Sequence, residues 1–451
     1  MKKIVLLALS LTLLLSCKKE EKKEIADATQ EIAPFSDAVP EGAVIYEANI
    51  RQYSPEGTFA AFAKDIPKLK QLGVKILWVM PIYPIGIEKR KEGLGSYYSI
   101  KDYKAVNPEF GKLEDFKNLV KTAHENGIYV ILDWVANHTA WDHAWVKEHP
   151  EYYAKDKDGK MISPFDWTDV VKLDYNNPAM RKAMVDEMKY WLTEANVDGF
   201  RCDVAAEVPT DFWDNASAEL KKTKPVFMLA EAEKPELSKK AFEMAYGWES
   251  HHIMNDIAQG KKTVKDWDNY ITKKDTTWEK DDFTMYFTSN HDENSWNGTE
   301  YERMGNAVET FAALTYVIPG MPLIYNGQEY DFNRRLKFFV KDSLTTTKGK
   351  MFPIYEKLGK LKNENVALNG GKNAASYKRI ASSSDQNILA FEREKQGKKV
   401  IFVGNLSKAN QTFSLPIEGE FTDYISGNKV VFTKEQKLTF KPWEYKILLA
   451  E

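Results

Sequence analysis

The chain has 451 residues, enough for more than one domain around a large apolar core. Hydrophobic residues make up 43% and charged residues 29%, an ordinary balance for a globular protein, so extensive disorder is excluded. The formal net charge of −3 leaves no electrostatic footprint for nucleic acid, and we predict no nucleic-acid partner.

The first 17 residues have the pattern of a secretion signal. Lys2 and Lys3 give a basic start, and residues 4–15 form an apolar run too short to span a membrane comfortably. The run ends in Leu-Leu-Ser-Cys at Cys17, which resembles a bacterial lipobox, although a plain secretory signal with an incidental cysteine is the alternative. We expect a signal peptide at 1–17 with a lipidated Cys17, membrane anchoring, and an outer-membrane lipoprotein facing the periplasm or the cell surface.

Residues 18–42 are charged, poor in large apolar side chains and contain two prolines, a composition typical of a flexible tether. Cys17 and Cys202 are the only cysteines in the chain. Acylation of Cys17 would therefore exclude an internal disulfide, and stability must come from the core.

From residue 44 onward, apolar strand patterns alternate with amphipathic helices. A strand at 44–50 precedes a helix over 59–72, whose apolar residues recur every three or four positions after the capping residue Thr58. A strand at 74–80 follows, and the unit repeats with a helical stripe over 113–123. Continuous apolar strands joined by helices indicate a parallel sheet buried on both faces.

Eight strands are predicted in this part of the chain. Besides 44–50 and 74–80 they lie at 128–132, 199–203, 226–231, near 251–254, 283–289 and 322–325. Eight such strands predict a (β/α)8 TIM barrel, whose site lies at the C-terminal ends of the strands.

The remaining segments define two smaller parts. The long connection at 139–173 is rich in aromatic residues and indicates an inserted subdomain. Residues 372–451 contain short alternating runs separated by Gly, Ser and Asn, which predict an antiparallel β domain. The barrel would then comprise residues 43–138 and 174–371.

Polar side chains end four of the predicted strands. They are Asp133 with Asn137 and His138, then Arg201 with Asp203, then Glu231, and finally His291 with Asp292. Residues two apart on a strand share a face, so Arg201 and Asp203 point together while Cys202 faces the helices as an inert thiol. The same rule places Glu231, rather than Glu233, in the barrel mouth.

This clustering predicts acid–base chemistry, although an isolated Arg-x-Asp pair is usually a structural ion pair. We expect the Arg201 guanidinium to keep Asp203 ionised, as a nucleophile requires. Like-charge coupling should raise the pKa of Glu231, as a general acid requires.

With these four stretches in order, the sequence resembles the α-amylase family of glycoside hydrolases, family thirteen. The resemblance covers roughly residues 43–451, includes residues 95–103 and Leu173–Asp174, and identifies 139–173 as a short domain B and 372–451 as a β-sandwich domain C. It implies a retaining double displacement on α-1,4-glucosidic bonds of starch, maltodextrin or related oligosaccharides, with two carboxyl groups about 5 to 5.5 Å apart and no cofactor for the chemistry.

The resemblance also implies a role for each matched residue. Asp203 would be the nucleophile, Glu231 the acid/base and Asp292 the stabiliser of the transition state. The substrate-binding residues would be Tyr98, His138, Arg201 and His291. For Asp133 the two alternatives are support of the barrel, which we favour, and contact with the substrate. Trp134, Trp141, Trp167 and Trp296 are candidate sugar platforms, each of which alone is more typical of packing.

The chain departs from the family after Asp203, where Val-Ala-Ala-Glu replaces a common Lys-His pair. This puts in doubt the usual contacts beyond the cleavage point and a calcium site that borrows the His carbonyl. Asn137 still matches the family's calcium ligand, so a structural Ca²⁺ is an open expectation, with Asp166, Asp169 or Asp174 as partners.

Two other functions fit the same residues. A 4-α-glucanotransferase would use a sugar hydroxyl in place of water at the second step. A non-catalytic glucan-binding lipoprotein could also be built on this fold, but retention of Asp203, Glu231 and Asp292 argues against it.

Overall fold

The computed structural model describes residues 32–434 and 436–450. The predicted signal peptide, Cys17 and most of the tether lie outside these residues. Within the described ranges, no helix is long and apolar enough to cross a membrane.

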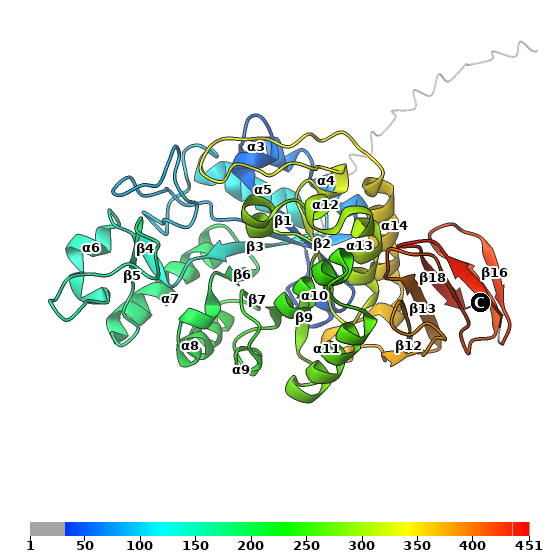
Figure 1. Cartoon of the computed structure of the whole chain (residues 1–451). Helices are drawn as coiled ribbons and strands as arrows, with labels where there is room; N and C mark the ends of the chain where they lie inside the picture. The colour runs from blue at the N-terminus through cyan, green and yellow to red at the C-terminus, as the bar shows by residue number, and fades with distance from the viewer. Residues whose placement is uncertain (1–31, 435, 451) are drawn as a thin grey trace, which may run out of the picture. The chain divides into compact units, whose positions relative to one another are not determined.

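Eight parallel strands close into a barrel in the order β1-β10-β9-β8-β7-β6-β3-β2. Figure 1 shows the barrel among the helices that surround it. Their bounds are β1 Val44–Ala48, β2 Val74–Val79, β3 Tyr129–Trp134, β6 Gly199–Cys202, β7 Phe227–Ala230, β8 Met244–Tyr246, β9 Phe283–Tyr286 and β10 Met321–Tyr325. The predicted TIM barrel is therefore confirmed, and seven of its strands lie where the sequence pattern placed them.

The sixth predicted strand, near 251–254, is wrong. This segment lies inside helix α10 (Trp248–Gln259), whose buried Ile253, Met254 and Ile257 follow helical spacing. The sixth barrel strand is β8, only three residues long, which pairs with both β7 and β9. Such a short strand has too few residues to show a period of its own.

Helices surround the barrel between its strands. Thr58 caps α3 as expected, its side chain accepting the N–H of Ala61, but the predicted helix over 59–72 breaks at residues 64–65 into α3 and α4. The helices are α1 Ala38–Glu41, α2 Ile50–Tyr53, α3 Phe59–Ala63, α4 Ile66–Gln71, α5 Leu113–Glu125, α6 Ala144–Glu148, α7 Pro178–Glu194, α8 Thr210–Lys221, α9 Pro235–Ser238, α10, α11 Val264–Thr277, α12 Glu300–Met304, α13 Val308–Val317 and α14 Met351–Glu364.

The barrel interior is a packed apolar core that is closed at its N-terminal end by Phe35. The Phe35 ring lies 5.2 Å from the Tyr129 ring and 5.3 Å from the Phe227 ring. Residues 38–41 then form α1, in which Glu41 is buried. The prediction of a flexible tether as far as residue 42 is thus corrected: residues 35–41 belong to the folded barrel because Phe35 supplies part of its core.

Strand β6 carries the central part of the site, and Gly199 allows it to approach β7. Gly199 has φ +153°, and a Cβ atom there would lie 1.9 Å from the carbonyl oxygen of Phe227. No side chain fits at this position. The pairing of β6 with β7 continues through Arg201 opposite Leu229.

The two smaller parts follow the expected arrangement. Between β3 and α7, strands β4 (His138–Ala140) and β5 (Val170–Lys172) pair antiparallel and flank α6. The C-terminal part is an antiparallel domain of a six-stranded sheet and a two-stranded sheet. It is drawn in orange to red in Figure 1. Its strands are β11 Lys378–Arg379, β12 Ile388–Lys395, β13 Lys398–Asn405, β14 Gln411–Phe413, β15 Gly419–Asp423, β16 Lys429–Phe432, β17 Leu438–Phe440 and β18 Tyr445–Ala450.

A buried carboxyl outside the site makes the stability of the fold depend on pH. Glu300 accepts hydrogen bonds from Thr288 and Gln328, and burial raises the pKa of Glu300 to about 7 from a usual value of 4.5. The folded state therefore keeps a proton that the unfolded state releases. The stability that this retained proton gives the folded state is fully present below about pH 4.5 and is lost as the pH rises through about 7.

We predict that Glu300→Gln flattens this pH dependence, because an amide does not ionise. Between pH 5 and pH 8 the free energy of unfolding of the wild type should fall by roughly 2–3 kcal/mol more than that of the variant. Urea unfolding at the two pH values measures the difference, with the exposed Glu88→Gln as the control. Parallel losses of stability in wild type and Glu300→Gln would contradict the assignment.

Candidate active site

A cleft of about 380 Å³ lies at the C-terminal ends of the barrel strands. It is lined by six of the residues singled out from the sequence, namely Tyr98, His138, Asp203, Glu231, His291 and Asp292. Arg201 does not line the cleft but lies fully buried beneath it. Four separate stretches of the chain thus meet at one site, as the strand pattern predicted.

Arg201 is the cation around which the carboxylates gather. Its Nη1 lies 2.8 Å from Asp133 Oδ1 and 3.1 Å from Asp203 Oδ1. Its Nη2 lies 2.9 Å from Glu231 Oε2, an ion-pair contact without hydrogen-bond geometry. Burial acts to lower the pKa of Arg201, but the charges of Asp133 and Glu231 outweigh it and raise that pKa. One guanidinium therefore joins three strand ends, β3, β6 and β7.

Aromatic side chains hold this guanidinium in place. Its carbon lies 4.8 Å from the centre of the Trp78 ring on β2, and its Nε donates to the Tyr246 hydroxyl on β8 at 3.2 Å. Trp78 also donates to Asp133 Oδ2 at 3.1 Å. The sequence reasoning missed Trp78 and Tyr246 because an aromatic residue within an apolar strand looks like ordinary core.

Asp203 and Glu231 share an environment that favours keeping a proton. Burial and the charge of Glu231 raise the pKa of Asp203 well above its usual value, and burial also raises the pKa of Glu231. Arg201 acts to lower the pKa of Asp203, but it also serves Asp133 and Glu231. The net shift of the Asp203 pKa is upward, which runs against the expectation that Arg201 keeps Asp203 ionised.

The geometry distinguishes the oxygens of this pair. Glu231 Oε2 takes both the Arg201 contact and the backbone N–H of Val204, at 2.7 Å. Val204 has φ +37° and ψ +48°, a strained conformation for a β-branched residue, and it lies directly after Asp203. The strained turn thus directs an N–H to Oε2 of Glu231, the same oxygen that contacts Arg201.

The two histidines of the cleft differ in charge. Burial lowers the pKa of His138 to about 4, so its ring is neutral at pH 7. Asn137 Nδ2 lies 3.2 Å from His138 Nδ1, so Nδ1 is the acceptor of this hydrogen bond. In the neutral ring the proton is then on Nε2, which can act as a donor. For His291, burial acts to lower the pKa, but the charges of Asp292 and Glu47 outweigh it and raise that pKa to about 9.

Aromatic residues form the walls of the cleft. Trp167 lines it near the His138 ring, at 5.5 Å between ring centres, and Trp296 lines it with 52% of its surface exposed. The Trp296 ring packs 5.2 Å from that of Phe338, a lining residue that the sequence reasoning missed in the long loop after β10. Of the other candidate platforms, Trp134 is buried core and Trp141 lies beneath Lys89 outside the cleft lining.

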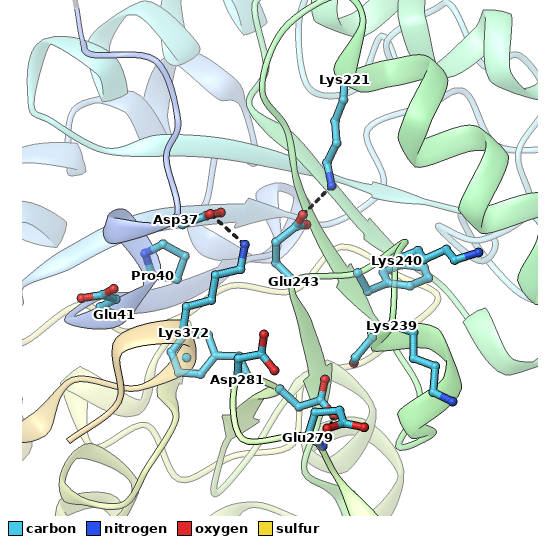
Figure 2. A pocket seen from close by; sticks show the side chains of 15 residues that line it. Asp37, Pro40, Glu41, Lys221, Lys239, Lys240, Glu243, Glu279, Asp281 and Lys372 are labelled. Atoms are coloured by element: carbon cyan, nitrogen blue, oxygen red, sulfur yellow. Dashed lines mark hydrogen bonds and ion pairs between the residues drawn. The ribbon is translucent and has the colours of Figure 1, made fainter. Parts of the chain in front are cut away.

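A second hollow, of about 470 Å³, lies at the opposite, N-terminal end of the barrel. Figure 2 shows two pairs of opposite charge in it: Lys372 pairs with Asp37 at 2.8 Å, and Lys221 pairs with Glu243 at 2.7 Å. The hollow lies at the end of a TIM barrel that serves stability rather than catalysis. The cleft above Arg201 is therefore the candidate active site.

Comparison with known proteins agrees with this geometry. The family model described as the catalytic domain of α-amylase matches residues 32–366. The chain belongs to the α-amylase family of glycoside hydrolases. The model described as the C-terminal domain of maltogenic amylase matches residues 379–447.

Members of the family with known structures cover nearly the whole chain. The maltogenic α-amylase AmyB from Thermotoga neapolitana is 29% identical with a TM-score of 0.84, covering 90% of this chain and 98% of its own. An α-amylase from Lactobacillus plantarum is 31% identical with a TM-score of 0.83, covering 91% and 99%. Among relatives compared by sequence, the α-amylase MalA from Haloarcula japonica is 23% identical over 86% of this chain, which spans only 58% of the length of MalA.

Three of the four residues expected at a calcium site have partners within the protein. Asn137 contacts His138, Asp169 pairs with Lys91 at 3.4 Å, and Asp174 accepts hydrogen bonds from Asn176 within its own turn. Across residues 32–434 and 436–450, no group of three or more His, Cys, Asp or Glu side chains is placed to hold a metal ion. A structural Ca²⁺ stays a prediction from the resemblance, and no step below involves a metal ion.

Proposed function

We propose that this glycoside hydrolase cleaves α-1,4-glucosidic bonds of starch, maltodextrin or related oligosaccharides with retention of configuration. The observation that carries the proposal is the contact of Asp203 and Glu231 with two nitrogens of one buried guanidinium, beside Asp292 in the same cleft. A carboxylate and a carboxylic acid held this close are what a double displacement needs.

In the first step, a carboxylate oxygen of Asp203 attacks the anomeric carbon of the bound sugar and forms a glycosyl ester. The glycosidic C–O bond breaks as Glu231 gives its proton to the departing oxygen. In the second step, Glu231 takes a proton from water, and the water oxygen displaces Asp203 from the anomeric carbon. Glu231 ends protonated and Asp203 ionised, so the cycle is complete.

The surrounding groups would act on charge and orientation. Arg201 offsets the negative charge that returns to Asp203 when the ester breaks, and Asp292, whose side chain is 39% exposed, faces the positive charge that develops on the sugar. His138 and His291 would donate hydrogen bonds to sugar hydroxyls, and Tyr98 would stack on the ring. Trp167 and Trp296 would hold neighbouring sugars.

A 4-α-glucanotransferase would form the same glycosyl ester and differ only in its acceptor. The chain lengths formed from maltoheptaose separate the two activities. We expect products shorter than the substrate, whereas longer chains would show transfer to a sugar hydroxyl.

We predict that Glu231→Gln lowers turnover of maltoheptaose by about 10³-fold, because an amide cannot give its proton to the leaving oxygen. Binding of maltoheptaose, measured by calorimetry, should stay within a few-fold of the wild type. The matched control is Glu233→Gln, since Glu233 accepts the N–H of Glu249 and does not line the cleft. Unchanged turnover in Glu231→Gln, or an equal loss in Glu233→Gln, would refute the assignment of the acid.

We further propose that the enzyme is anchored to the outer membrane by a lipid on Cys17, facing the periplasm or the cell surface. The support is the basic start, the short apolar run and the Leu-Leu-Ser-Cys ending of the first 17 residues.

Radioactive palmitate supplied to the producing bacterium should label the wild type and Cys202→Ser, because Cys202 lies in the core. Cys17→Ser should lose both the label and its place in the membrane fraction. Label that persists in Cys17→Ser would contradict the anchor.

A further inference from the structure

Glu47 is a buried carboxylate that no role described so far requires. It lies on β1 with none of its surface exposed, among strand residues that are otherwise apolar. Its Oε1 lies 2.5 Å from His291 Nδ1. In the described part of the chain, its Oε2 has no hydrogen-bond partner. A buried carboxylate is costly unless it is paired, so the contact with His291 is what compensates its burial.

The other ring nitrogen of His291 faces the cleft. Its Nε2 lies 2.8 Å from the Tyr98 hydroxyl and 3.4 Å from Asp292 Oδ2. The His291 and Tyr98 rings are stacked, with 5.4 Å between their centres. Glu47, His291 and Tyr98 therefore form a chain of contacts that leads from the barrel core to the substrate cleft.

The direction of the hydrogen bonds along this chain follows from Asp133. The Tyr98 hydroxyl donates its one hydrogen bond to Asp133 Oδ2 at 3.1 Å. Asp133 also accepts hydrogen bonds from Trp78 and Arg201. Burial raises the pKa of Tyr98 well above its usual value, so the hydroxyl keeps that proton. Its oxygen is then free to accept, and His291 Nε2 must be the donor.

We propose that Glu47 is a positioning residue that acts through His291. Its carboxylate accepts a hydrogen bond from the Nδ1–H of His291, which fixes the orientation of the ring. It thereby keeps Nε2 protonated as a hydrogen-bond donor toward the sugar. With both nitrogens protonated, His291 is the second cation of the site. Five carboxyl groups then face two cations: Glu47, Asp133, Asp203, Glu231 and Asp292 against Arg201 and His291. This role adds a positioning residue to the proposed function, and its kinetic test rests on that function.

Each element packed around the pair contributes to this balance. The charged and titratable groups that face Glu47 or His291 are Asp133 on β3, Arg201 on β6, Glu231 after β7, Tyr246 on β8, Tyr325 on β10, Tyr98 in the loop after β2, and Asp292 beside His291. Burial raises the pKa of Glu47, while His291 and Arg201 act to lower it. We place the proton on the ring, because the charges of Asp292 and Glu47 both favour the imidazolium.

The test compares the wild type with Glu47→Gln by nitrogen NMR of protein labelled at its seven histidines. The signals of His291 are assigned by their loss in His291→Asn. At pH 7.5 we expect both ring nitrogens of His291 to be protonated in the wild type and the ring to be neutral in Glu47→Gln. A neutral His291 in the wild type, or an unchanged ring in the variant, would overturn the proposal whether or not the substrate assignment holds.

Kinetics then separate positioning from a general structural effect. We expect kcat/KM on maltoheptaose to fall about 10- to 100-fold in Glu47→Gln at pH 8 and the deficit to shrink at least threefold at pH 5.5, where His291 regains its proton. Glu47→Asp retains a carboxylate and should recover part of the activity. The control is Glu329→Gln, which should keep the wild-type kcat/KM. Glu329 is also buried and accepts a hydrogen bond from Tyr46, which lies on β1 beside Glu47. A deficit that is equal at both pH values, with normal thermal stability, would contradict the proposal.

Discussion

Burial of one guanidinium among carboxylates is the constraint on which the site depends. Arg201 is fully buried and contacts Asp133, Asp203 and Glu231, which lie at the ends of three different strands. A buried charge is tolerated only when its partners are present, so the barrel must close correctly for the cation to be satisfied. Gly199 contributes by letting β6 lie close enough to β7.

The same arrangement bears on the acid–base role proposed for Glu231. Arg201 is shared by three carboxyl groups, and burial raises the pKa of both Asp203 and Glu231. Arg201 and the Val204 N–H both contact Oε2 of Glu231 rather than Oε1. Glu47 and His291 would add a second pair of opposite charges, in which His291 lies at the wall of the cleft that contacts the sugar.

Much of this site was predictable from sequence, because polar residues at the ends of apolar strands are visible against their background. Period-two alternation correctly placed Arg201 and Glu231 toward the barrel axis and Cys202 toward the helices. The short strand β8 escaped detection, as did the contribution of Phe35 to the core, since neither shows a period. Glu47 left a readable signal, a charge within an apolar strand, but its partner is 244 residues away and only the fold brings them together.

The most direct test of the central claim is to trap the glycosyl ester. Glu231→Gln incubated with a 5-fluoro-α-glucosyl fluoride, whose fluoride leaves without acid help, should accumulate the intermediate because deglycosylation is slowed. Mass spectrometry of the protease-digested protein should then find one added fluoroglucosyl group on the peptide that contains Asp203, and none in the Asp203→Asn variant of the same protein. A label on another carboxylate would contradict the account.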